Sequence, residues 1–84
     1  MITVIYFARL REALGKASEQ IALPAGVSDL ESLRELLRKR GGAWAEELAD
    51  KGPVRAAVNQ DMARGNTAVC DGDEIAFFPP VTGG

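Results

Sequence analysis

Residues 1–8 are almost entirely apolar, and most of them are β-branched or aromatic, which predicts a first β-strand. Successive side chains of a strand point to opposite faces. The two faces of this strand therefore carry Ile2, Val4 and Tyr6 on one side and Thr3, Ile5 and Phe7 on the other. Because both faces are largely apolar, we expect the core to cover one of them and a partner to be able to cover the other.

The clearest helical pattern starts after residue 27. Ser28 is followed three residues later by Glu31, a spacing that predicts an N-terminal capping box. The leucines that follow share one stripe of a helix, and Gly41 predicts a left-handed end. The stripe consists of Leu30, Leu33, Leu36 and Leu37. This segment is the main helix that the sequence predicts.

Shorter elements fill the rest of the chain. Residues 9–15 predict a polar connector with helical character, and residues 18–23 a second strand that pairs with the first as a hairpin. Trp44 and Leu48 are four residues apart, which predicts a short helix or turn within residues 43–50. Further strands, with a tight turn at 60–61, are predicted at 55–59, 62–63 and 75–78.

This order predicts an α+β fold, a mixed sheet of four to five strands packed on one main helix, which covers only one face of the sheet. The charge of Glu74 turns its face outward together with Ala76 and Phe78, and leaves Ile75 and Phe77 for the core. By the same alternation Ala56 and Val58 point inward, and Arg55, Ala57 and Asn59 outward. The exposed face then carries an apolar patch, and such a patch on a small domain usually marks a docking surface. The patch consists of Ile5, Phe7, Met62 and Phe78.

The last residues predict a narrow arm beyond the sheet. Pro79 and Pro80 cannot donate a backbone N–H, so regular pairing should stop there. We therefore expect one domain over residues 1–78 and a flexible diglycine tail over 79–84. At about 3.3 Å per residue, six residues reach roughly 20 Å from the domain, far enough to enter a site on another protein.

A carboxylate at the end of such an arm is a poor electrophile until it is activated. Conversion to an acyl phosphate, as in adenylation by ATP, would let a nucleophile leave a thioester, an amide or a thiocarboxylate at Gly84. Glycine suits this role because it lacks Cβ and fits a narrow channel. The pair Gly83-Gly84 alone is also compatible with an inert, frayed end or with residues left over from an expression vector.

Composition and charge exclude several other functions. The net charge of −2 gives no basic face for nucleic acid, and the basic run Arg34, Arg38, Lys39 and Arg40 is interpreted as a solvated helix end. The chain has no histidine and a single cysteine, so we expect no metal site, and we interpret Cys70 as a small, partly buried filler without a catalytic role. The apolar opening is interpreted as a strand rather than a signal peptide or membrane span, which makes the cytoplasm the expected location.

The last fourteen residues, at positions 71–84, read DGDEIAFFPPVTGG. They closely resemble the carboxyl-terminal signature of the MoaD family of ubiquitin-like sulfur carriers, the small subunits of molybdopterin synthase. The opening strand with the following Arg9-Leu10-Arg11-Glu12 is similar to the start of that family. Ala56-Ala57-Val58-Asn59-Gln60 matches its third strand and turn. The resemblance spans the whole chain at matching spacings.

The resemblance implies a β-grasp fold and a defined role. A ubiquitin-activating-like adenylyltransferase would adenylate Gly84 with ATP, and a persulfide donor would convert it to a thiocarboxylate. The tail would then enter the large synthase subunit and transfer sulfur to precursor Z, within a heterotetramer of two large and two small subunits. Carried over, Pro80, Val81, Thr82 and Gly83 bind in the channel, and Phe7, Met62 and Phe78 contact the partner. No cofactor is expected to be stably bound, and the catalytic side chains would belong to the large subunit.

Other readings of the same residues stay open. A carrier of the same fold could serve thiamine synthesis, transfer-RNA thiolation or a tungsten cofactor. A protein modifier would instead form isopeptide bonds through Gly84, and a plain interaction module would have an inert tail. An oxygen-for-sulfur exchange at the terminus would indicate a carrier, lysine adducts a modifier, and an unmodified terminus the inert module.

Overall fold

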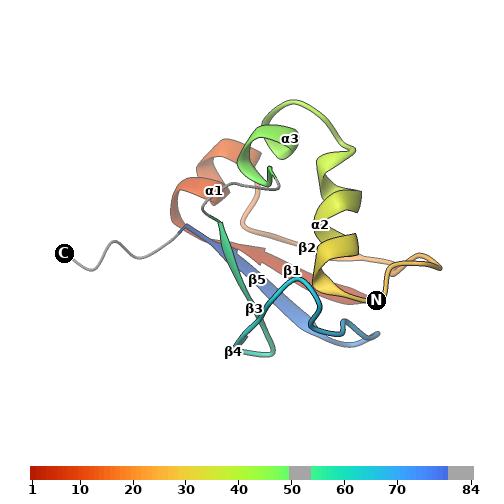
Figure 1. Ribbon diagram of the computed structural model, residues 1–84. Coiled ribbons are helices and arrows are strands. Elements are labelled where there is room, and N and C mark those ends of the chain that lie inside the picture. The colour runs from red at the N-terminus through yellow and green to blue at the C-terminus, as the bar shows by residue number, and fades with distance from the viewer. Residues whose placement is uncertain (50–53, 80–84) are drawn as a thin grey trace.

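The computed structural model describes residues 1–49 and 54–79, which form one mixed five-stranded sheet with helices on one side (Figure 1). The strand order is β2-β1-β5-β3-β4. β1 and β5 are parallel neighbours at the centre, and the remaining pairs are antiparallel. The strands are β1 (Ile2–Tyr6), β2 (Ser18–Ile21), β3 (Arg55–Val58), β4 (Asp61–Met62) and β5 (Glu74–Phe78).

The helices of the described chain are α1 (Ala8–Leu14), α2 (Leu30–Arg38) and α3 (Ala43–Glu47), and all lie on the same side of the sheet in Figure 1. α2 is the predicted main helix, and its Leu33 and Leu37 are fully buried. The segment predicted as a polar connector is a complete short helix, α1, which ends at Gly15 in the left-handed conformation. Leu10 and Leu14 of α1 are buried, so the link between β1 and β2 also contributes to the core.

α2 begins one residue later than the predicted capping box places it. Asp29, not Ser28, is the N-cap, and its carboxylate accepts the backbone N–H of Ser32 at 2.8 Å. The reason is a contact distant in sequence. The carbonyl of Ser28 accepts the N–H of Val69, and Asp29 forms a β-bridge with Ala68, so the chain stays extended through Asp29. Gly41 has a φ of 78°, as the prediction of a left-handed end requires.

The predicted alternation of the sheet residues is confirmed. Ile75 and Phe77 of β5 are fully buried and belong to the core cluster with Ala56 and Val58 of β3. Ala57 was predicted to face outward, yet it is only 8% exposed. It does not belong to the core cluster, because it lies on the other face, where Met62 opposes it on one side and Ala76 on the other.

The turn between β3 and β4 lies one residue earlier than predicted and fixes the start of β5. Asn59 and Gln60 both have positive φ, the geometry of a tight hairpin turn. The Asn59 side-chain amide donates to the Asp73 carboxylate at 3.0 Å, and its carbonyl oxygen accepts the N–H of Glu74 at 3.0 Å. One side chain therefore ties the hairpin to the first residue of the central strand.

Cys70 is exposed, so the prediction that it fills a partly buried position is wrong. Val69 takes the inward position of this loop and is 3% exposed. The backbone N–H of Cys70 donates to the Asp73 carboxylate, which holds the loop while the thiol faces outward.

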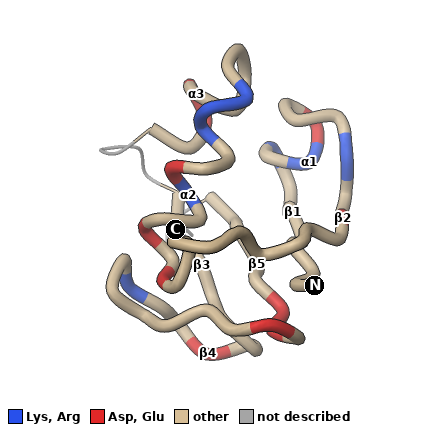
Figure 2. The backbone as a smooth tube through the Cα atoms, turned by 90° about the vertical axis from the view of Figure 1, so that its right-hand side faces the viewer, with Lys and Arg blue, Asp and Glu red and all other residues tan. Residues whose placement is uncertain are grey.

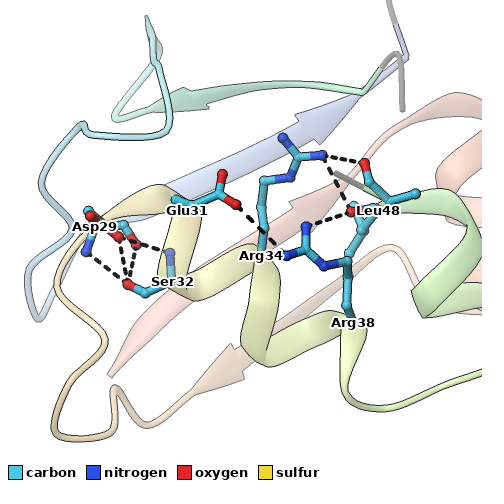
Figure 3. A network of polar contacts seen from close by, with 7 residues as sticks. Asp29, Glu31, Ser32, Arg34, Arg38 and Leu48 are labelled. Atoms are coloured by element: carbon cyan, nitrogen blue, oxygen red, sulfur yellow. Dashed lines mark hydrogen bonds and ion pairs between the residues drawn. The ribbon is translucent and has the colours of Figure 1, made fainter. Parts of the chain in front are cut away.

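The interpretation of the basic run as a solvated helix end is wrong for its arginines. Arg34 donates to the carbonyl oxygens of Leu48 and Ala49, and Arg38 donates to that of Leu48 at 3.2 Å (Figure 3). A short helix leaves its last carbonyls without intrahelical partners, and here the guanidinium groups of α2 bind them at the end of α3. These contacts join α2 to the end of α3, a pairing that the sequence alone does not predict.

Arg40 belongs to a second polar cluster, which links the end of α2 to β2 and α3. Its guanidinium group forms two hydrogen bonds with the Glu19 carboxylate, at 2.8 and 3.0 Å, and lies 4.4 Å from the ring centroid of Trp44. The Tyr6 hydroxyl donates to the same carboxylate at 2.8 Å. Burial, together with that hydrogen bond, raises the pKa of Tyr6 far above its usual value. Burial acts against the Glu19 charge, but the hydrogen bonds from Arg40 and Tyr6 outweigh it and lower the pKa of Glu19.

We expect the fold to lose stability in acid. The pKa of Glu19 is lowered from 4.5, that of Asp29 from 3.8 by Ser32, and that of Asp73 from 3.8 by Asn59 and then the Cys70 N–H. The unfolded chain therefore binds more protons than the folded chain, and stability falls as the pH drops below about 4.5. The melting temperature should be nearly flat from about pH 6 to 8, because the chain has no histidine, and fall by about 5 °C or more between about pH 5 and 3.

Thermal melts across this pH range test the acid prediction. Glu19→Gln serves as the comparison, because it removes one of the three carboxylates and should show a smaller fall in acid than the unmodified chain. A melting temperature that rises toward acid pH would contradict the prediction.

Candidate docking face and carboxyl-terminal segment

The segment predicted to carry the chemistry starts at the end of the central strand. β5 lies between β1 and β3, and the backbone N–H of Phe7 donates to the carbonyl of Phe77 at 3.1 Å, beyond the end of β1. Pro79 follows Phe78 and has no N–H with which to extend the ladder. The predicted tail-binding residues Pro80, Val81, Thr82 and Gly83, and the reactive Gly84, lie outside the described residues.

The sheet face away from the helices is apolar, and we call it the docking face. Its middle is a row across four strands, defined by the strand register: Ile5 opposes Ala76, Ala76 opposes Ala57, and Ala57 opposes Met62. At about 4.8 Å between strands, this row spans roughly 14 Å. The apolar residues of the docking face are Ile5, Phe7, Ala57, Met62, Ala76 and Phe78. Arg55 and Glu74 lie on the same face at its two ends.

The three predicted contact residues all lie on the docking face and reach solvent. Phe7 is 48% exposed and Met62 67%, and Phe78 is half-buried. Phe7 and Phe78 lie at the end of the sheet where the chain leaves β5, and Met62 lies on the edge strand β4. Large apolar side chains left exposed around two small alanines form a surface suited to a protein partner.

The hollow found at this end, among the described residues, is small for a small-molecule substrate. A hollow of about 110 Å³ lies beside Pro79, between α1 and α3, whereas ligand pockets are typically about 300–1,000 Å³. Arg9 and Glu47 on its rim form an ion pair at 3.3 Å. A larger hollow, about 300 Å³, lies between residues 24–27 and α2, and none of the docking-face residues lines it.

The described residues offer no other chemical centre. Within residues 1–49 and 54–79, no group of three or more His, Cys, Asp or Glu side chains is arranged to hold a metal ion. None of the helices in that part of the chain is long and apolar enough to cross a membrane.

Two residues that sequence analysis left without a role contribute to this site. Asn59 fixes the start of β5. The feature of the sequence that could have revealed it is an asparagine in a turn that requires left-handed backbone. Arg55 opposes Phe78 at the end of the docking face, and its signal was an outward-facing charge at the start of a strand. The alternation of side chains along the strand predicted that Arg55 points outward, but it did not predict that Phe78 is its neighbour on β5.

The sheet order, with its parallel central pair and a helix packed across one face, defines a ubiquitin-like β-grasp domain, as predicted. Solved structures share this fold over nearly the whole chain. A putative molybdopterin converting factor subunit 1 from Pyrococcus furiosus has a TM-score of 0.77 and 31% identity, covering 95% of this chain and 97% of that one. SAMP1 from Haloferax volcanii has a TM-score of 0.77 and 26% identity, covering 99% and 98%.

The chain belongs to the ThiS family, whose model matches residues 4–84. It is 43% identical to the molybdopterin synthase sulfur carrier subunit of Escherichia coli and 44% identical to that of Haemophilus influenzae, over 100% of each chain. A solved complex of subunits 1 and 2 of the molybdopterin-converting factor from Helicobacter pylori contains a similar chain, with a TM-score of 0.64, 27% identity and coverage of 99% and 97%. The family predicted from the tail motif is thus confirmed.

Proposed function

We propose that this protein is the sulfur carrier subunit of a molybdopterin synthase. The docking face seats it on the large subunit, and the segment after Pro79 delivers sulfur from a thiocarboxylate at Gly84 to precursor Z. The observation that carries the proposal is the position of that segment: it follows the central strand at the end of the sheet where Phe7 is exposed and Phe78 half-buried. Full-length identity of 43–44% to two subunits of that name supports it.

The chemistry explains why the carrier needs no catalytic side chain. A carboxylate oxygen of Gly84 attacks the α-phosphate of ATP, releases pyrophosphate and leaves an acyl adenylate. The terminal sulfur of the donor's persulfide displaces AMP and gives an acyl disulfide, which a thiol reductant cleaves to leave the thiocarboxylate. The resulting thiocarboxylate is a far better nucleophile near neutral pH than the carboxylate. The sulfur atom itself then carries the reactivity, and acids and bases come from the partner.

Binding to the partner orients this sulfur. A docked carrier turns a bimolecular encounter into a step within one complex, which is worth a large effective concentration when the geometry is right. The docking face is the larger contact, and the narrow segment after it reaches the reacting centre. Two transfers to one precursor complete the dithiolene that later binds molybdenum.

The proposal includes a set of partners. A ubiquitin-activating-like adenylyltransferase supplies ATP-dependent activation, a persulfide enzyme donates sulfur, and two large and two small subunits assemble as a heterotetramer. The complex of subunits 1 and 2 from Helicobacter pylori supports a large-subunit partner. Because activation uses ATP, we place the protein in the cytoplasm.

The test is a reconstituted reaction. The chain bearing a chemically prepared thiocarboxylate at its terminus, mixed with the large subunit and precursor Z, should yield the dithiolene product, and omission of the large subunit should abolish the product. The same chain with an ordinary carboxylate is the control and should give none. If the loaded chain binds the large subunit but transfers no sulfur, the proposed reaction is wrong.

A protein-modifier function is the second candidate, and the fold shared with SAMP1, named a small archaeal modifier protein in related structures, favours it. The two candidates share activation at the terminal glycine and differ in the nucleophile that follows. A modifier would give lysine adducts in cells, whereas a sulfur carrier would give a thiocarboxylate and no adducts. The 26% identity to SAMP1 against 43–44% to the synthase subunits favours the carrier.

A further inference from the structure

Within residues 1–49 and 54–79, Arg55 is the only basic residue at a strand position that faces away from the helices. It opposes Phe78 in the β3/β5 register, so both side chains lie on the docking face at the end where residues 80–84 begin. Arg55 is exposed. The next pair of side chains on this face, toward the middle row, is Ala57 and Ala76, and both are apolar. The positive charge of Arg55 therefore lies beside Phe78, at the end of the sheet that carries the aromatic side chains of the docking face.

Several other basic residues of the domain have partners within the described chain. Arg9 pairs with Glu47, Lys16 and Arg40 with Glu19, and Arg34 with carbonyl oxygens at the end of α3. Arg55 has no acidic partner within residues 1–49 and 54–79.

The docking face has opposite charges at its two ends. Glu74 begins β5 on the same face, four residues before Phe78, so the two ends are separated by roughly 13 Å of strand. Acidic residues also gather at the lower end of the sheet in Figure 2, around β4 and the loop that leads into β5. The face is therefore positive where the carboxyl-terminal segment begins and negative at the far end. A partner with the reverse order of charges would bind in one orientation only.

We propose that Arg55 determines which partner surface fits the docking face, and that the large synthase subunit meets it with a carboxylate side chain beside the entrance for residues 80–84. The inference rests on the proposed function. Binding over Phe78 would remove Arg55 from water, and an arginine buried without an anion is strongly unfavourable. A carboxylate also matches the planar guanidinium group, which can donate two parallel hydrogen bonds to it.

Charge reversal at Arg55 tests this contact. We compare the dissociation constant of the large subunit for the unmodified chain, Arg55→Glu, Arg55→Met and Lys39→Glu, at about 50 and 500 mM NaCl. Lys39→Glu is the matched control, because it makes the same change of charge at an exposed position of the helical layer. Arg55→Met keeps much of the apolar stem and removes only the charge.

At low salt Arg55→Glu should weaken binding by about 10-fold or more and Arg55→Met by about 3-fold, and the loss for Arg55→Glu should shrink severalfold at high salt. Lys39→Glu should bind within about 2-fold of the unmodified chain, and all variants should melt within about 3 °C of it. Equal affinities for Arg55→Glu and Lys39→Glu would overturn the inference. So would equal losses for Arg55→Met and Arg55→Glu, because a facing carboxylate should repel the introduced glutamate and make its loss the larger one.

Failure of the proposed function gives a different result. In that case the unmodified chain itself does not bind the large subunit, and the inference falls with it. If the unmodified chain binds and Phe78→Asp does not, while Arg55→Glu binds normally, the function stands and only the role of Arg55 is wrong.

Discussion

Removal of Gly84 is expected to leave a folded protein that still binds the large subunit and no longer transfers sulfur. The shortened chain ends in a carboxylate on Gly83, about 3.5 Å short of its former reach. A displacement of about 1 Å at a reacting centre can cost about 100-fold in rate, so sulfur transfer should fall by at least that factor. The melting temperature should change by less than about 1 °C, because the core ends with β5.

Gly84→Ala is the matched control for this deletion. It keeps the reach of the chain and adds only a methyl group next to the reacting carboxyl, so transfer should be reduced less than by the deletion. Binding to the large subunit, sulfur transfer and melting temperature are measured for all three proteins. Transfer by the shortened chain at the rate of the full chain would exclude Gly84 as the sulfur-bearing residue.

Phe78→Asp is expected to weaken binding to the large subunit by about 30-fold or more, the effect of losing an aromatic contact worth about 2 kcal/mol at an interface. The side chain lies on the docking face, so the isolated domain should lose no more than about 1 kcal/mol of stability. Titration of the large subunit and thermal melts of the isolated chain measure the two effects separately.

Phe77→Ala is the paired variant on the opposite face of the same strand. Phe77 is fully buried and its ring stacks on that of Tyr6 with a centroid distance of 6.2 Å, so its loss should cost about 3–5 kcal/mol of stability. The neighbouring residues thus separate folding from docking. A large fall in melting temperature for Phe78→Asp would contradict the assignment of Phe78 to the docking face.

The faces of the sheet were predictable because single residues reveal them. The charge of Glu74 excludes its side of β5 from the core, and the alternation then assigns Phe77 inward and Phe78 outward, as the structure has them. The apolar character of both sides of β1 likewise indicated that Phe7 is available for a partner. The candidate docking residues therefore followed from a local rule of period two.

Features that depend on contacts distant in sequence were not predictable in the same way. The bridge between Asp29 and Ala68 moves the helix cap by one residue, and the loop position of Val69 turns Cys70 outward. The binding of Arg34 to carbonyls of α3 likewise requires the packing of two helices. Local sequence predicts a cap, a filler and a solvated cation at these positions, and tertiary pairing overrides each of them.

The motif of the carboxyl-terminal segment was predictable as a sequence, and the family it indicates is confirmed. The roles assigned to Val81, Thr82 and Gly84 stay predictions, since these residues lie outside the described part of the chain. Their chemistry depends on a covalent change and on a partner, and neither follows from the packing of the domain. The experiments on Gly84 and on the docking face address these two dependences separately.

The most direct measurement is the mass of the carboxyl-terminal peptide of protein purified from cells with intact sulfur metabolism. The account predicts that a fraction of the peptide carries sulfur in place of one carboxyl oxygen of Gly84, and that this sulfur is lost when the large subunit and precursor Z are added together. A terminus that never carries sulfur, or one that keeps it in the presence of both, would contradict the claim that this domain exists to deliver sulfur from its last residue.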